Sequence, residues 1–281
     1  MKGIMTEKLD MTGIKNHWQN LASKFGEKIE ATTKTHTAKD VELHALEQAF
    51  NHLNLNLISP LRILEAGCGN GINLFWLNSK YPELVLTGFD YIPEMIDSAL
   101  EQRKKLKISH ENLDFLVSSF ANFVNAGPKF DLIFTVRALI NLNSDNMQQS
   151  AIKKLAKELQ VGGYLILLEN SQQAHASQNQ FRVKSGLPTR KVAEYNHFID
   201  ENTFSNKLEG TGLKLLSTTD FIGIHDLLLY ILLPMINGGV IDYGNEIVQA
   251  TTTLIKTLNF EELNQLGGFG QNRLFMCYKC E

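Results

Sequence analysis

Cysteine is scarce in this sequence of 281 residues, and its scarcity excludes a disulfide-stapled protein. Three cysteines are too few for a disulfide framework, and their odd number is typical of a reducing compartment. Cys277 and Cys280 form a C-x-x-C pair, but a tetrahedral zinc site requires more ligands and the sequence has no second pair of this kind. We therefore expect a cytoplasmic protein without a bound metal ion.

Long hydrophobic runs are lacking as well. The most apolar stretch, residues 226–236, is about half as long as the roughly 20 residues that a transmembrane helix needs. Residues 1–18 contain no unbroken apolar segment of the kind that marks a signal peptide. We expect no stable membrane insertion. Residues 226–236 are expected to pack in a helical cap, with a dimer interface and a membrane surface as alternatives.

Neither sign of charge dominates the chain. Its 27 lysine and arginine residues and 30 aspartate and glutamate residues give a formal net charge of −3. Such a chain has no long-range field that would attract a phosphate backbone, so nucleic acid is not expected as a partner. The content of 43% hydrophobic residues is ordinary for a globular protein with a sizeable core.

Apolar runs alternate with helical patterns along the middle of the chain. The runs that predict strands are residues 61–66, 83–90, 113–118, 130–136, 163–169 and, near the end, 270–280. The patterns that predict helices are residues 71–80, 93–106, about 120–125, and 145–159. Because the strands are apolar throughout and alternate with helices, we expect an α/β fold, with a doubly wound and mostly parallel sheet covered by helices on both faces.

Segments outside this alternation predict a cap. Residues 1–58 are expected to form a helical lid, and residues 59–281 a Rossmann-like domain. That domain is expected to carry cap insertions at about 171–199 and 222–268, where an open α/β sheet builds its binding crevice. Pairing of two chains through the inserted helices would give a homodimer.

The stretch "LEAGCGNG", residues 64–71, runs from a predicted strand into a glycine-rich turn and a helix. Such a turn presents backbone N–H groups and a helix N-terminus to a polar ligand. The dinucleotide fingerprint G-x-G-x-x-G would require glycine at position 72, where Ile72 stands, and the carboxylate of Glu65 would repel a pyrophosphate. A carboxylate suits a cationic ligand such as S-adenosylmethionine (SAM), which carries a sulfonium and an ammonium group.

This stretch resembles the first motif of the class I, Rossmann-like, SAM-dependent methyltransferases. The resemblance covers residues 61 to about 170 and the final strand. It implies a seven-stranded sheet whose last strand is antiparallel, with SAM as the cofactor and S-adenosylhomocysteine (SAH) as the product. The cofactor-binding residues that the resemblance implies are Glu65, Gly67, Cys68, Gly69, Gly71, Asp90, Tyr91, Met95, Ser119, Phe120 and Val136.

Individual roles follow from the same resemblance. Asp90 is expected to bind both ribose hydroxyls, and Tyr91 and Met95 to flank the adenine. Ser119 stands where the family usually has an acidic residue for the adenine amino group, and a hydroxyl can accept that hydrogen bond without charge assistance. Cys68 is expected to be a small residue in the loop rather than a reactive thiol.

Three residues are candidates for the acceptor side of the reaction. Arg137 suits the capture of a carboxylate or phosphate, with a structural ion pair as the alternative. Glu169, at the end of a predicted strand, is a candidate to orient an acceptor hydroxyl or amine, and His197 is a candidate base. Asn141 occupies a position where the family often carries histidine, so the usual base is missing there.

The sequence therefore predicts SAM-dependent O- or N-methylation of a small molecule. A sugar-like or carboxylated acceptor would suit the composition of the expected cap. Residues 16–35, which include Trp18, are expected either to close as a lid or to pack against the sheet. The alternatives are an inactive SAM-binding scaffold or regulator and, less favoured, an NAD-dependent oxidoreductase.

Overall fold

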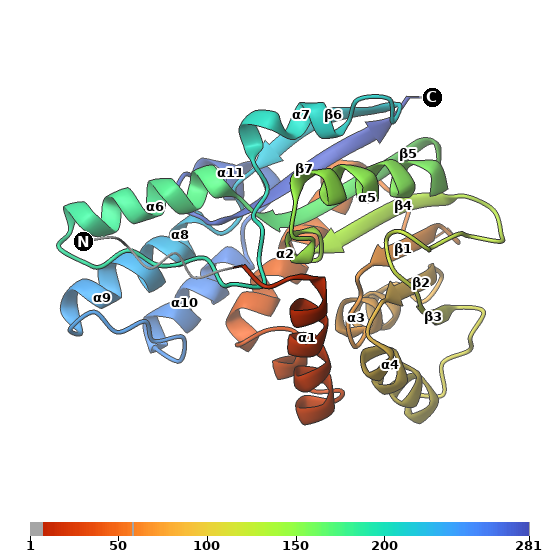
Figure 1. Cartoon of the computed structure of the whole chain (residues 1–281), viewed down its shortest axis with the longest axis horizontal. Coiled ribbons are helices and arrows are strands. Elements are labelled where there is room, and N and C mark those ends of the chain that lie inside the picture. Colours follow the sequence, from red (N-terminus) through yellow and green to blue (C-terminus); the bar gives the residue numbers. More distant parts are fainter. Residues whose placement is uncertain (1–7, 58, 281) are drawn as a thin grey trace.

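The computed structural model describes residues 8–57 and 59–280, which form a seven-stranded sheet in the order β3-β2-β1-β4-β5-β7-β6 (Figure 1). Neighbouring strands from β3 to β5 are parallel, and β7 runs antiparallel to both β5 and β6. This topology confirms the expected fold class. The strands are β1 (Arg62–Ala66), β2 (Val85–Asp90), β3 (Leu113–Val117), β4 (Phe130–Val136), β5 (Leu159–Asn170), β6 (Leu213–Thr219) and β7 (Asn272–Lys279).

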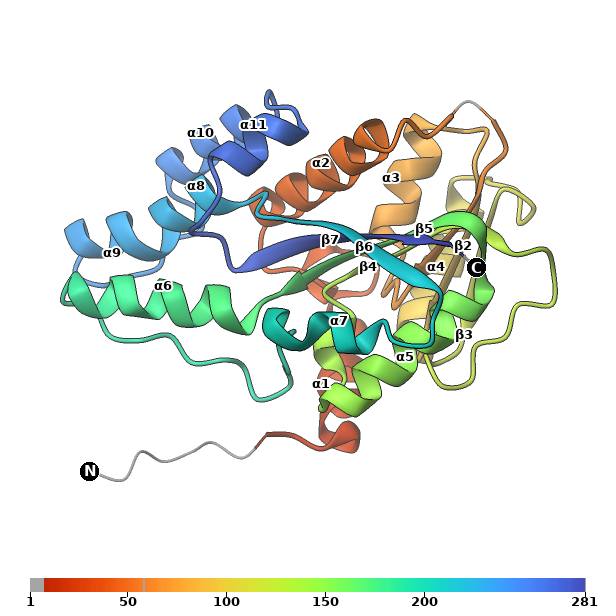
Figure 2. The same ribbon diagram turned by 90° about the horizontal axis from the view of Figure 1, so that it is seen from above.

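Helices cover both faces of the sheet. Figure 2 shows α2, α3, α8, α10 and α11 on one side and α1, α5, α6 and α7 on the other. One buried apolar cluster lies under α2 and α3, and a second lies between the sheet and α5. The helices are α1 (Met11–Phe25), α2 (His36–His52), α3 (Ile72–Lys80), α4 (Pro93–Lys105), α5 (Asp145–Glu158), α6 (Gln172–Lys184), α7 (Phe204–Lys207), α8 (Gly223–Leu227), α9 (Leu233–Ile236), α10 (Glu246–Ile255) and α11 (Phe260–Gln265).

Two sequence expectations fail at irregular segments. The helix expected at about 120–125 is absent, and these residues form turns between β3 and β4. Asn125 explains part of this, because its side chain hydrogen-bonds to the backbone of Gly127 and Pro128 and so competes with a helix. Strand β6 lies outside the ranges predicted as strands, since its residues alternate between buried and exposed and form no continuous apolar run.

The cap segment 222–268 is more broken than expected. The stretch 226–236, which was expected to be helical, is divided among α8, a π-helical turn (Leu228–Leu232) and α9. Pro234 sits in the first turn of α9, where its missing N–H is tolerated. Leu229 and Leu233 pack with Val248 of α10, so this apolar stretch lies within the cap. Among the described residues, none of the helices has both the length and the apolar character needed to cross a membrane.

The N-terminal segment has two parts that pack differently. Helix α2 belongs to the main core, where its Val41, Leu46 and Phe50 are buried. Helix α1 packs instead beside α4, and its Trp18 lies in a cluster with Met95. The chain from α1 to α2 therefore passes directly over the glycine loop that follows β1, and this path positions the site described next.

Candidate active site

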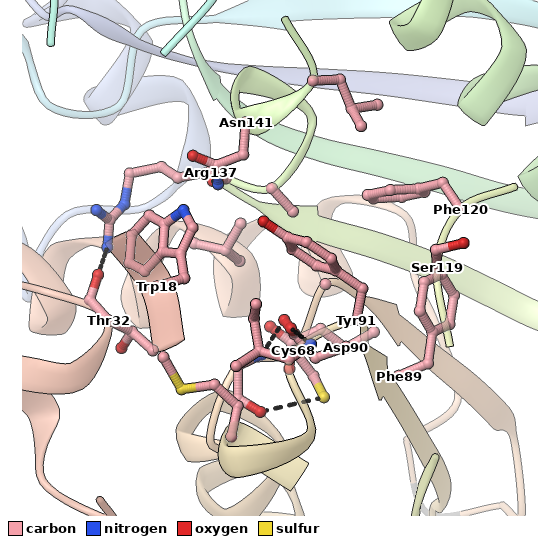
Figure 3. Close-up of a pocket in the computed structure, with 18 of the residues that line it drawn as sticks. Trp18, Thr32, Cys68, Phe89, Asp90, Tyr91, Ser119, Phe120, Arg137 and Asn141 are labelled. Carbon is pink, nitrogen blue, oxygen red and sulfur yellow. Dashed lines mark hydrogen bonds between the residues drawn. The ribbon is translucent and has the colours of Figure 1, made fainter. Parts of the chain in front are cut away.

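A cavity of about 440 Å³ lies at the carboxyl ends of β1, β2 and β4 (Figure 3). Helices α1, α2 and α5 complete its walls. The sequence-predicted residues that line it are Glu65, Gly67, Cys68, Gly69, Asp90, Tyr91, Met95, Ser119, Phe120, Val136 and Arg137. Residues 71, 169 and 197 are not among its lining residues. The structure therefore brings together most of the predicted set.

The glycine loop comes very close to its neighbours. A Cβ on Gly67 would lie 2.5 Å from Ala138 Cβ, and one on Gly69 would lie 2.7 Å from Thr32 Cγ2. Both glycines have positive φ, which L side chains rarely adopt. Gly71 begins α3, and a Cβ there would lie 2.6 Å from the ring of Phe115. Gly71 thus allows close packing against Phe115 and does not itself line the cavity.

Asp90 ties the glycine loop to the turn after β2. Its Oδ2 accepts from the backbone N–H of Gly69, and its Oδ1 accepts from that of Ile92, both at 2.9 Å. Burial raises the pKa of Asp90 to about 6, although the backbone donors oppose this rise. The carboxyl group lines the cavity and retains unused lone pairs for a ligand hydroxyl.

Glu65 and Lys39 both hydrogen-bond to the side chain of Asn73. Asn73 Nδ2 donates to Glu65 Oε1 at 2.5 Å, and Lys39 Nζ donates to Asn73 Oδ1 at 3.1 Å. Glu65 Oε2 is buried and has no hydrogen-bond partner in the described part of the chain. Burial raises the pKa of Glu65 to about 8, so the carboxyl group holds a proton at neutral pH. All three side chains line the cavity.

An ion-pair chain extends from Lys39 to the loop after β4. Glu42 lies 2.9 Å from Lys39 Nζ through its Oε2 and 2.6 Å from Arg137 Nε through its Oε1. Burial alone would raise the pKa of Glu42, but the charges of Arg137 and Lys39 outweigh it and lower the pKa. Arg137 also donates to Thr33 Oγ1. The arginine is therefore held in the structural ion pair that the sequence left open as an alternative.

Lys39 and Glu42 were missed in the sequence. Both lie on the buried face of α2, where they are almost fully shielded from solvent. Charged residues are costly at such places unless they are paired or meet a ligand. Lys39 and Glu42 share one helical face with the apolar Leu46 and Phe50, and these two charges on an apolar face were the signal that could have revealed them.

The structure corrects the expectation for Glu169. This carboxyl group is fully buried and does not face the cavity. Its Oε1 accepts from Thr135 Oγ1 at 2.7 Å and from the backbone N–H of Leu139 at 3.0 Å, while Oε2 accepts from that of Ile140 at 3.2 Å. Glu169 therefore holds the loop after β4 in place and cannot orient an acceptor directly.

His197 is also corrected as a candidate base. Its Nε2 lies 3.5 Å from Asp145 Oδ2, and its Nδ1 lies 2.5 Å from Lys8 Nζ. Burial, with a further contribution from Lys8, lowers the pKa of this imidazole. Its backbone N–H donates to Ile140 O at 2.6 Å. The histidine thus lies behind the loop after β4, away from the cavity lining.

A family model described as a methyltransferase domain matches residues 58–212, which is more than half of the chain. The chain belongs to this methyltransferase family. A curated relative, the malonyl-[acyl-carrier protein] O-methyltransferase of Priestia megaterium, is 28% identical over 160 residues. That match covers 55% of each protein, so the chain spans about half the length of this curated relative.

Solved structures resemble the methyltransferase in fold. Magnesium protoporphyrin IX methyltransferase from Synechocystis PCC 6803, with bound SAM, has a TM-score of 0.57 at 14% identity and covers 97% of this chain and 99% of its own. The plantazolicin methyltransferase in complex with SAH has a TM-score of 0.57 at 14% identity and covers 96% of this chain and 95% of its own. These likenesses confirm the class I Rossmann-like fold, and the family match favours SAM over a nicotinamide cofactor.

Proposed function

We propose that the chain transfers the methyl group of SAM to a small-molecule acceptor. The observation that carries this proposal is the pair formed by Lys39 and Glu65, which line one cavity and are kept apart by Asn73. Lys39 Nζ has three N–H donors and uses two of them on Asn73 and Glu42, so one is left for a ligand. Glu65 Oε2 likewise has no hydrogen-bond partner among the described residues.

This arrangement fits a zwitterionic amino-acid group. Glu65 Oε2 would accept from the α-ammonium group of SAM, and Lys39 would donate to its α-carboxylate. Both contacts would satisfy groups whose burial is otherwise costly. A nucleotide pyrophosphate offers no cation for Glu65, so the same pair discriminates against NAD. The unpartnered Oε2 thus supports the assignment of SAM to this cavity.

The rest of the cavity fits the nucleoside part of SAM. We assign the ribose hydroxyls to Asp90, which sits at the end of β2 beside the glycine loop. The adenine is assigned to the space between Tyr91, Met95, Ser119 and Phe120. Gly67, Cys68 and Gly69 offer backbone that a ligand can approach closely.

Bound SAM supplies a methyl group on a sulfonium, and the chain contributes alignment and exclusion of water. Helix α1 contributes Met11 and Trp18 to the wall, so we propose that α1, within the segment 1–58 that was expected to form a lid, covers the cavity. Arg137 and Glu42 connect α2 of this segment to the loop after β4. That ion pair would hold α2 and the loop after β4 in one arrangement.

A SAM-binding scaffold without catalysis is the second candidate. Glu169 and His197, the candidate bases from the sequence, lie outside the cavity lining, and this favours a weak or absent proton-abstracting function. Incubation with methyl-labelled SAM and a metabolite extract, followed by mass spectrometry, separates the two. We expect a labelled small molecule. If SAH binds but no small molecule is labelled above the level of a boiled control, the result would support the scaffold instead.

A further inference from the structure

One part of the cavity wall consists of neutral groups. It is formed by α1, the loop after β4 and the first turns of α5, through Met11, Trp18, Asn141, Leu142, Met147 and Ser150. The charged residue beside this wall is Arg137, whose guanidinium is matched by Glu42 at 2.6 Å. An acceptor seated here would meet apolar surface and a few uncharged hydrogen-bonding groups.

Asn141 lines this space, and its amide has a defined orientation. Its Nδ2 donates to the backbone O of Arg137 at 2.9 Å, which fixes the orientation of the amide. Its Oδ1 is buried and has no partner within residues 8–57 and 59–280. A buried acceptor without a donor is unfavourable, so a ligand that brings an N–H or O–H to this atom gains affinity.

Two unpaired polar groups flank Asn141 in the same cavity. The indole Nε1 of Trp18 and the hydroxyl of Tyr91 are buried and lack partners among the described residues. Figure 3 shows both rings beside the cavity, with Asn141 above them. Burial raises the pKa of Tyr91, so its phenol keeps its proton and is no base. The aromatic face of Trp18 beside these polar atoms suits a ring-sized ligand.

We infer that the methyl acceptor is a neutral amine on an apolar, ring-sized body, and that its N–H donates to Asn141 Oδ1. This inference rests on the proposed function. In the transfer, the nitrogen lone pair forms the new N–C bond while the electron pair of the C–S bond returns to sulfur. The positive charge passes from sulfur to nitrogen, and the methylated ammonium later releases its proton to solvent.

The carboxamide of Asn141 disfavours nucleophiles other than a neutral amine. A hydroxyl can donate to Asn141 Oδ1, but it must also lose its proton to attack, and an amide oxygen does not take up a proton at neutral pH. A carboxylate would bring negative oxygen against Oδ1, and the nearby Arg137 is already paired with Glu42. A neutral amine needs neither a base nor a free cation.

Three matched probes test this inference. 2-Phenylethylamine, 2-phenylethanol and phenylacetate share one ring and differ in the nucleophile. Each is incubated with the full chain and methyl-labelled SAM between pH 7 and 9, and the labelled product is quantified. We expect label on the amine above the other two, with a rate that rises as the neutral fraction of the amine increases. The inference would be overturned if the alcohol or the acid were labelled more than the amine, or if the three probes were labelled equally.

Variants connect the effect to Asn141. Asn141→Leu removes the amide oxygen and is expected to lower transfer to the amine about tenfold or more while SAH still binds. Asn146→Leu, at an exposed position of α5, is the matched control and should leave transfer unchanged. If SAH fails to bind the wild-type chain, the proposed function is wrong. If SAH binds but Asn141→Leu and Asn146→Leu transfer equally, only the acceptor inference is wrong.

Discussion

Lys39 and Glu65 line one cavity without touching, because Asn73 accepts from the lysine at 3.1 Å and donates to the carboxyl group at 2.5 Å. Direct contact would have used the remaining donor of Lys39 and the remaining acceptor of Glu65 on each other. Separation by a neutral amide preserves one donor and one acceptor. The pair comes from two distant segments, α2 and β1, so cofactor binding and the position of the N-terminal segment are expected to depend on each other.

Asp90→Asn is expected to weaken SAH binding. The change removes a charged acceptor for the ribose hydroxyls and one of the two hydrogen bonds that Asp90 accepts from the backbone of Gly69 and Ile92, which together correspond to roughly 10- to 100-fold in Kd. Isothermal titration calorimetry with SAH measures it. Asp97→Asn, at an exposed position of α4, is the control. Equal Kd values for the two variants would refute the ribose assignment.

SAM affinity should depend on pH through Glu65. Burial raises its pKa to about 8, so the free protein is protonated there at neutral pH, and an ammonium ligand must displace that proton. Affinity is therefore predicted to rise from about pH 6.5 to 8 and to level off above the pKa of about 8. Asp90, with a pKa of about 6, contributes mainly below this window.

Titrations in buffers of different ionisation enthalpy measure the proton release that accompanies SAM binding. Glu65→Gln has no proton to release, so its affinity should be lower and nearly independent of pH in this window. A wild-type affinity that stays flat from pH 6.5 to pH 8 would contradict the contact between Glu65 and the ammonium group.

Glu169→Gln is expected to destabilise the fold. The new amide nitrogen cannot accept from the backbone N–H groups of the loop after β4, so at least one buried donor loses its partner. Such a loss costs about 1–3 kcal/mol of the free energy of unfolding. Urea denaturation measures the change against Glu209→Gln, an exposed control. Equal stabilities of the two variants would show that the loop does not depend on Glu169.

Gly69→Ala should cost more than Gly186→Ala. Both glycines have positive φ, so each substitution carries a backbone cost of about 1–2 kcal/mol. At Gly69 the new Cβ would also lie 2.7 Å from Thr32 Cγ2, whereas no atom lies within 4 Å at Gly186. Thermal unfolding and SAH binding should both be impaired further in Gly69→Ala. Identical behaviour of the two variants would mean that the close approach of Thr32 is relaxed without cost.

The sequence predicted most of the sheet, and most of the residues that it predicted to bind the cofactor line the cavity, because both depend on local patterns. Continuous apolar runs identify buried parallel strands, and the glycines with Glu65 mark the loop after β1. Strand β6 escaped prediction because an edge strand with one exposed face lacks such a run. Local sequence patterns thus predict a strand well where both of its faces are buried, because such a strand must be apolar throughout.

The sequence did not predict the directions in which side chains point. Glu169 ends β5 as predicted, but its oxygens face the backbone of the loop after β4 rather than the cavity. Lys39 was missed because Asn73 of α3, its partner at the cavity, is brought to it by tertiary packing of α2. Pairings between distant segments depend on how helices dock, and spacing along one chain does not encode that directly.

The proposed cofactor-binding site is tested most directly by comparing the binding of SAH with that of 5′-methylthioadenosine, which lacks the amino-acid group. Calorimetry is done on the wild-type chain, on Lys39→Met and on the exposed control Lys34→Met. Lys39→Met should weaken SAH binding roughly 10- to 100-fold and leave 5′-methylthioadenosine binding unchanged. Equal weakening of both ligands, or unchanged SAH binding, would contradict the pairing of Lys39 and Glu65 around a zwitterionic group.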